Sequence, residues 1–211
     1  MDYLLVLDYD HLDEPVFLKS LANALGRLSS KQGLIVHGDS AYTERIIQTG
    51  VMSDEAKKRS IKDLNNRLIA LFADSGISAV GLNGYQQDII RKDDDKWEIK
   101  TDYLKSFPAG VNLVLTTLVA SRNKQQTEAV SLAELVDHLA SEMNFSEAIV
   151  FTKNDAEELK ATESSVLPLS TANHEDDQSV IAAHLPTELH QLNTPLVITS
   201  TQNIESVLEK F

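Results

Sequence analysis

One short stretch of this sequence ends in residues that could bind an anion. The apolar run Leu34-Ile35-Val36 leads into His37-Gly38, and Asp39 and Ser40 follow at once. Branched apolar residues followed by helix-capping types are typical of a buried parallel strand that turns into a helix. Ligands in open α/β sheets bind just outside such strand ends, where helix N-termini offer free N–H groups to anions. Gly38, Asp39 and Ser40 are therefore candidate ligand-binding residues.

The same residues have a second interpretation that needs no ligand. Asp39 and Ser40 are good N-cap residues, so a capped helix start explains them fully. The positive end of the helix dipole suits the Asp39 carboxylate as well as an external anion. We favour capping over phosphate binding, and His37 is more typical of a structural histidine than of a catalytic base.

A second strand end offers a further pair of candidates. Ala79–Leu82 is a short apolar run that ends in Asn83-Gly84. Because parallel strands place their carboxyl ends at one edge of a sheet, this turn is equivalent in position to the first. Asn83 and Gly84 are therefore added to the candidate ligand-binding residues.

Other catalytic and metal-binding patterns are missing from the sequence. The six histidines include no i, i+4 pair and no His-Glu-x-x-His motif, and the chain has no cysteine. The acidic runs Asp93–Asp95 and His174–Asp177 could attract a divalent cation, but solvated turns and loops are the commoner origin of such clusters. No metal site is predicted. The sequence also has no Gly-x-Ser-x-Gly elbow, no Walker A motif and no Gly-x-Gly-x-x-Gly loop.

Apolar periodicity predicts strands and helices that alternate along the chain. The expected strands are Tyr3–Leu7, Leu34–His37, Ala79–Leu82, Val111–Thr117, Ala148–Thr152 and Pro195–Thr199, with a hairpin over residues 88–100. The expected helices are Pro15–Ser30, Asp54–Ser75, Asp102–Phe107, Ser131 to near Met143, and Ile204–Phe211. Residues 154–178 are expected to be loop or irregular structure. The alternation predicts an α/β fold with a largely parallel sheet covered on both faces.

Composition limits the compartment and the partners. The chain has 211 residues, enough for one α/β domain or two small lobes. The lack of cysteine fits a reducing compartment, and the N-terminus has no basic segment and no apolar run of signal-peptide or membrane-span length. A cytoplasmic protein without membrane contact is expected. The formal charge of −13 repels the phosphate backbone, so nucleic acid is not an expected partner.

Several segments resemble the amino acid kinase family, and acetylglutamate kinases in particular. Asn65–Phe72 and Ala79–Gly84 are similar to the family's Asn-x-x-Leu helix and the Ala-Val-Gly-Leu-Ser-Gly segment that follows it. Leu34–Gly38 is similar to the family's strand that ends in His-Gly-Gly-Gly. The later strands and the closing helix also match in place and type, at Ala148–Thr152, Pro195–Thr199 and Ile204–Phe211.

The resemblance implies a three-layer αβα sandwich in a single domain, residues 1–211. Residues 1–130 would form the lobe for an acidic substrate, and residues 131–211 a reduced lobe for ATP. The implied reaction is transfer of the γ-phosphoryl group from MgATP to a carboxylate. Many family members are homodimers, and the helix Asp54–Ser75 is the candidate dimer surface.

The residues that would carry this reaction depart from the family pattern. In the family the first strand ends in a lysine and a glycine pair, whereas this chain has Leu7 and then Tyr9 and Asp10 at those positions. Two aspartates beside a γ-phosphate would repel it, and the second glycine loop keeps only Gly38. Of the family's later acidic motif, Glu134 alone keeps its chemical type, and the capping box Ser131-Leu132-Ala133-Glu134 accounts for it without catalysis.

The nucleotide half departs further. The last of the eight glycines is Gly110, and no two glycines are adjacent. A lobe without glycine lacks the usual means of bringing backbone N–H groups close to a polyphosphate. Lys153 and Lys160 are the basic residues best placed to meet a nucleotide, although exposed lysines are common at any surface.

Two hypotheses follow from these residues. In the favoured one, the chain is a divergent acetylglutamate-kinase-like protein without phosphotransferase activity, with no cofactor, that acts as a binding, regulatory or structural homodimer. Its ligand would be a small acidic metabolite, or its partner an active kinase. In the alternative, it is an active enzyme that phosphorylates N-acetylglutamate or a related acidic amino acid with ATP and Mg²⁺. The loss of several preorganised charged groups together favours the first hypothesis.

Overall fold

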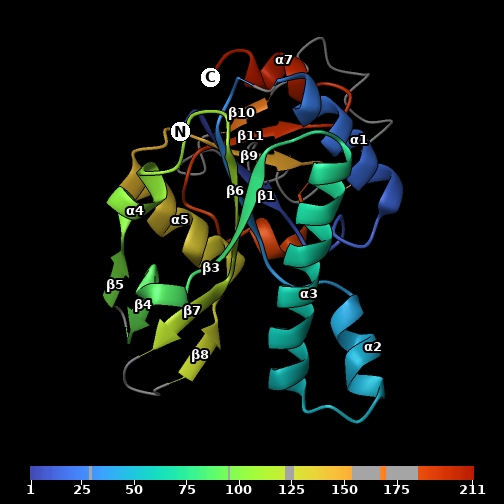
Figure 1. Cartoon of the computed structure of the whole chain (residues 1–211), viewed down its shortest axis with the longest axis vertical. Helices are drawn as coiled ribbons and strands as arrows, with labels where there is room; N and C mark the ends of the chain where they lie inside the picture. Colours follow the sequence, from blue (N-terminus) through green and yellow to red (C-terminus); the bar gives the residue numbers. More distant parts are fainter. Residues whose placement is uncertain (29, 95, 122–125, 154–166, 170–184) are drawn as a thin grey trace.

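The chain folds around a seven-stranded sheet (Figure 1). A computed structural model describes residues 1–28, 30–94, 96–121, 126–153, 167–169 and 185–211. The strand order is β10-β11-β9-β1-β2-β6-β3, in which all pairs are parallel except β10 with β11. The strands are β1 (Tyr3–Leu7), β2 (Gly33–His37), β3 (Ala79–Asn83), β6 (Asn112–Thr116), β9 (Ala148–Phe151), β10 (Leu167–Leu169) and β11 (Leu196–Thr199). The predicted parallel sheet is confirmed.

Helices cover both faces of this sheet, because its strands are apolar on both sides. Tyr3, Leu5 and Leu7 of β1 pack with α1 (Pro15–Arg27), α3 (Ser53–Asp74) and α7 (Ile204–Leu208). Leu4 and Val6 pack on the opposite face with α5 (Leu132–Met143) and α4 (Thr101–Lys105). Alternate side chains of a strand point to opposite faces, so the continuous apolar run of β1 fills two cores. The three-layer αβα architecture is confirmed.

A second, smaller sheet lies beside the first and was only half predicted. Its order is β5-β4-β7-β8, with β4 (Ile90–Asp93), β5 (Lys96–Ile99), β7 (Leu118–Ser121) and β8 (Gln126–Ala129). The β4–β5 hairpin confirms the prediction for residues 88–100. Strand β7 follows β6 after the single residue Thr117, which hydrogen-bonds to both His37 and Val130 through its backbone. A one-residue break leaves no turn signal in the sequence, and this is why β7 was missed.

Several of the remaining helices and strands have boundaries that differ from the predicted ones. Leu167–Leu169 is a strand and not irregular structure, while the rest of 154–178 lies outside the described residues. The first and last helices end earlier than expected, at Arg27 and Leu208. The helix after β2 is α2 (Tyr42–Gln48), and two short 3-10 turns are η1 (Gln86–Asp88) and η3 (Thr187–Leu189). In Figure 1, α2 lies beside the N-terminal half of α3.

One buried side-chain oxygen joins the amino ends of β1, β2 and β6 through two hydrogen bonds. The Tyr3 hydroxyl donates to Asn112 Oδ1 over 2.7 Å, and the Gly33 N–H donates to the same oxygen over 2.9 Å. The Tyr3 ring lies directly against Gly33, where a Cβ atom would stand 2.1 Å from the nearest ring carbon. Glycine at position 33 is therefore required by the close approach of the ring.

None of the helices in the described part of the chain combines the length and the apolar character that crossing a membrane requires.

Candidate functional site

The carboxyl ends of the central strands bring polar residues to one edge of the sheet. Asp8 follows β1, Gly38 follows β2, Thr117 follows β6 and Thr152 follows β9. These strands are neighbours and parallel, so the four residues lie along the same edge. Ligands of open α/β sheets bind in the crevice at this edge, which makes it the place to look for a site.

In the loop after β1, a buried carboxylate forms hydrogen bonds with groups of the loop itself, and we call this the closed loop. Asp8 is fully buried, and its Oδ2 lies 2.6 Å from His11 Nδ1. His11 Nε2 lies 3.0 Å from the carbonyl oxygen of Thr152, and a carbonyl can only accept, so Nε2 carries a hydrogen. Asp8 Oδ1 also accepts the N–H groups of Asp10 and His11, at 3.0 and 3.4 Å.

A second carboxylate, from near the end of the chain, reaches the same loop. Glu188 lies in η3, and its Oε2 accepts the Tyr9 N–H over 3.1 Å. The other oxygen, Oε1, lies 3.5 Å from the point that a Cβ on Gly38 would occupy. Burial raises the pKa of the Glu188 carboxyl to about 7, and the nearby charges of Asp8 and Asp39 add to this effect. The Tyr9 N–H and Lys57 oppose the increase only in part.

The candidates Asp39 and Ser40 have separate roles. The Asp39 carboxylate lies 3.4 Å from Lys57 Nζ and accepts from the Thr43 hydroxyl, so the expectation that it caps the helix is wrong. Ala41 is at the N-cap position, because helix α2 begins at Tyr42. A cap at Ser40 would start the helix one residue earlier, and a cap at Asp39 two residues earlier. Ser40 Oγ, together with Asp13 Oδ2, accepts the Tyr42 N–H at this start.

The candidates Asn83 and Gly84 have contacts in the corner where the two sheets meet. Asn83 Oδ1 accepts from the Thr116 hydroxyl over 3.1 Å. A Cβ on Gly84 would stand 2.8 Å from the carbonyl oxygen of Leu118, so the two backbones touch there. The contacts described for this pair therefore join the end of β3 to β6 and β7, and none of them reaches Glu188.

Two buried side chains beside Gly38 keep polar atoms without partners. Burial lowers the pKa of the His37 imidazole to about 4, and its Nδ1 lies 2.9 Å from the Gly38 carbonyl, so the ring is neutral with the proton on Nδ1. Within the described part of the chain, His37 Nε2 and Thr117 Oγ1 have no hydrogen-bond partner. The structural role of His37 stays a prediction, and its hydrogen bonding within the described residues is incomplete.

Glu134 stands away from this edge and does not form the predicted capping box. Ser131 precedes α5 but makes no side-chain hydrogen bond to the helix start. Both Glu134 oxygens accept from Lys92 Nζ, at 2.6 and 2.8 Å. An ion pair with β4 has therefore replaced the local contact that the motif suggested.

Replacing Glu134 by glutamine tests this structural role. We expect the free energy of unfolding to fall by less than about 1 kcal/mol, because ion pairs that remain partly exposed contribute little. Urea unfolding measures the change, with Glu142→Gln on the exposed side of the same helix as the control. A loss above about 2 kcal/mol would contradict a simple surface pair.

The remaining sequence candidates do not join the site. Lys153 is exposed directly after Thr152. Lys160, the run His174–Asp177 and Asp95 lie outside the described residues. Within the predicted nucleotide lobe, residues 154–166 and 170–184 are not described. Among the residues that the structure does describe, no three His, Asp or Glu side chains are grouped so as to hold a metal ion.

Glu188 was not found by sequence reasoning. It sits in a stretch with no clear periodicity, and its partner Tyr9 is 179 residues away. Neither residue belongs to a recognisable motif. No local signal in the sequence could have identified the contact.

Comparison with known proteins shows the fold and little more. No protein-family model and no curated protein matches the chain. An isopentenyl phosphate kinase matches with a TM-score of 0.64 and 17% identity, over 99% of this chain and 96% of that one. An aspartate kinase from Synechocystis matches with 0.69 and 10%, over 96% of this chain and 38% of that one. N-acetylglutamate synthase from Neisseria gonorrhoeae, complexed with coenzyme A and N-acetyl-glutamate, matches with 0.63 and 15%, over 98% and 55%.

Proposed function

We propose that this protein, whose fold is that of the amino acid kinases, transfers no phosphate and uses the carboxyl edge of its sheet for binding or regulation. The observation that carries the proposal is the closed loop after β1. Its three successive N–H groups, at Tyr9, Asp10 and His11, all donate to internal carboxylates. Successive backbone N–H groups are a common cradle for phosphate, and here Asp8 and Glu188 occupy it.

The charges at this edge also oppose phosphoryl transfer. That reaction depends on positive charge around the moving group, and removing one such group typically costs about a hundredfold or more in rate. Of the described side chains, Lys57 is the one cation that acts on Glu188, and it also pairs with Asp39 at 3.4 Å. A γ-phosphate beside Gly38 would meet the carboxylates of Glu188 and Asp39, and Lys57 is already paired with Asp39.

The fold itself does not decide the reaction. The similar structures include proteins named as kinases and one named as a synthase, at identities of 17% and below. One fold commonly carries different functions, so function has to be argued from the site. The carboxylates at this edge also argue against the acidic metabolite that the likeness to acetylglutamate kinase implied.

The proposed state is a homodimer through α3, alone or with an active kinase as its partner. Small-angle scattering gives the mass in solution, and a monomer at all concentrations would rule out the dimer. The proposal that the protein transfers no phosphate does not depend on the mass in solution, because the closed loop after β1 lies within one chain.

Calorimetry with nucleotide tests the absence of phosphotransfer. We expect no heat when ATP or ADP is added with Mg²⁺ and N-acetylglutamate, and no acyl phosphate, because the cradle is filled. Circular dichroism on the same sample confirms that the protein is folded. Micromolar nucleotide binding together with acyl-phosphate formation would overturn the proposal and support the active amino acid kinase.

A further inference from the structure

We propose that a groove between α1 and α3 binds a small carboxylate that carries one apolar ring, with the ring among leucines and the carboxylate on Arg67. The inference goes beyond the proposed function and does not rest on it, because the residues that line the groove take no part in the hydrogen bonds of the closed loop. It is carried by the size of the groove, by its apolar walls and by the N–H donors of one guanidinium.

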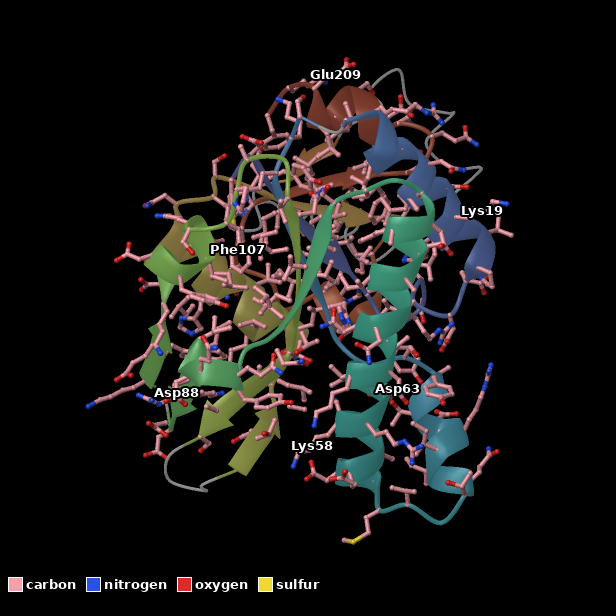
Figure 2. All side chains as sticks on the ribbon, in the orientation of Figure 1. Lys19, Lys58, Asp63, Asp88, Phe107 and Glu209 are labelled. Atoms are coloured by element: carbon pink, nitrogen blue, oxygen red, sulfur yellow. The ribbon has the colours of Figure 1, made fainter. Side chains whose placement is uncertain are left out.

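The groove lies where α1 runs beside the C-terminal half of α3 (Figure 1). Figure 2 labels Lys19 and Asp63 on these two helices, and they are the chain neighbours of Leu18 and Leu64 in the groove. The α1 side contributes Leu12, Pro15 and Leu18, and α3 contributes Leu64, Leu68 and Leu71. Ligand sites are typically apolar with a small number of placed polar groups, and here the polar group is Arg67.

The groove has room for one ring. Its volume is about 190 Å³, and an apolar cavity of about 150 Å³ is enough to hold benzene. Leu12, Leu64 and Leu68 are at most 2% exposed, so the core fixes the floor of the groove. Pro15 and Leu71 are open to solvent at its rim. Apolar walls without a packing partner lose dispersion contacts, so an apolar group that fills the space is favoured.

Arg67 supplies a positive charge at the rim. Its Nη1 lies 3.7 Å from Asp13 Oδ1, which is beyond hydrogen-bond range. Its other described contact is with the ring of Tyr42, whose centroid lies 6.0 Å from Cζ. Within the described residues, the guanidinium therefore keeps its N–H donors for a ligand. Arginine binds carboxylates through two parallel hydrogen bonds, so a carboxylate is the group that complements this rim.

Asp13 is the other charge at the rim, and it does not use the donors of Arg67. Asp13 Oδ2 accepts the Tyr42 N–H over 2.9 Å, which holds this carboxylate at the start of α2. The side chain of Arg67 is 53% exposed, so a carboxylate from solvent can reach it. Asp13 weakens the attraction for such a ligand, which gives the proposal a test of its own. A second copy of this chain is the alternative occupant, because α3 is the proposed dimer surface.

Calorimetry with 3-phenylpropionate tests the groove at pH 7 and 0.15 M salt. We expect saturable binding with one acid per chain. The alcohol 3-phenylpropanol has the same ring and no charge, so it should bind about fivefold more weakly, the upper range for an exposed ion pair. The amine 3-phenylpropylamine should bind more weakly still, because Arg67 repels it. Propionate, which lacks the ring, should give no measurable heat.

Four variants locate the binding. Arg67→Gln should weaken binding of the acid about fivefold and leave the alcohol unchanged, whereas Arg59→Gln, a change at an exposed arginine of the same helix, should have no effect. Asp13→Asn should tighten binding of the acid, because it removes a competing charge and keeps an oxygen for the Tyr42 N–H. Leu71→Trp should abolish binding of both compounds by filling the groove, with circular dichroism as the check that it folds.

Several outcomes would overturn the carboxylate site. These are no heat with the acid, an amine that binds as tightly as the acid, equal binding by the Arg67 and Arg59 variants, weaker binding by Asp13→Asn, or binding that survives in a folded Leu71→Trp. An affinity for the acid that falls as protein concentration rises would show that a second copy of the chain occupies the groove instead. Nucleotide binding in the separate titration bears only on the proposed function, so the two failures are distinguishable.

Discussion

Glu188→Gln should stabilise the folded protein by about 2 kcal/mol at pH 8. A carboxyl whose pKa rises from 4.5 to about 7 on folding is costly to ionise in the native state. The full shift corresponds to about 3 kcal/mol at 1.36 kcal/mol per unit, and solvent access to Glu188 reduces it. Glutamine keeps an oxygen for the Tyr9 N–H and carries no charge, so the cost disappears.

The sign of the pH dependence follows from proton binding. Between pH 4.5 and about 7 the unfolded chain has lost the Glu188 proton while the native state retains it, so native stability falls as pH rises through this window. Below pH 4.5 both states are protonated, and the variant and the native chain should be equally stable with respect to this group. The difference between them should grow from near zero to its full size by pH 8.

Urea unfolding of the two proteins at several pH values measures this difference. Glu209→Gln serves as the control, because Glu209 is exposed at the end of α7. A difference that stays constant from pH 5 to pH 8 would show that Glu188 titrates normally.

The second large effect is expected at the opposite edge of the sheet. Gly33→Ala should lower the free energy of unfolding by about 3 kcal/mol or more, the upper range for inserting a methyl group into a packed core. The new Cβ would stand 2.1 Å from the Tyr3 ring, which is 2% exposed and fixed by its hydrogen bond to Asn112. Neither the ring nor the strand pair can move without breaking other contacts.

A double-mutant cycle isolates the clash. Tyr3→Leu destabilises on its own, but combined with Gly33→Ala the total loss should be clearly less than the sum of the two, because the ring is gone. Gly38→Ala is the matched control, since its nearest contact is 3.5 Å and its cost should stay near that of a surface change. Additive losses would show that the ring does not limit position 33.

Most of the sheet could be predicted because its strands are encoded locally. Leu34–His37 and Ala148–Thr152 are runs of branched apolar residues between polar segments, and such runs read as buried parallel strands without any knowledge of their neighbours. Gly76 follows Ser75, the C-cap of the long helix α3, and has a positive φ of +74°, a conformation that favours glycine at this position. These signals lie within a few residues of the element that they define.

The site could not be predicted to the same extent, because its contacts are long-range. The Ser131–Glu134 pattern matches a capping box, yet Lys92, 42 residues away, takes the Glu134 carboxylate. Asp39 has the right type for a cap and pairs instead with Lys57 on another helix. In both cases a charged partner brought close by the tertiary fold competed successfully with a local backbone contact. The role of Glu188 depends entirely on such a partner.

The contact between Tyr9 and Glu188 also has a kinetic consequence. It closes a loop of 179 residues, and contacts of high sequence separation form only after much chain entropy has been lost. Tyr9 precedes Glu188 along the chain, so its N–H group is made before the carboxylate that accepts it. A chain that stops before residue 188 would leave the Tyr9 amide without this carboxylate partner.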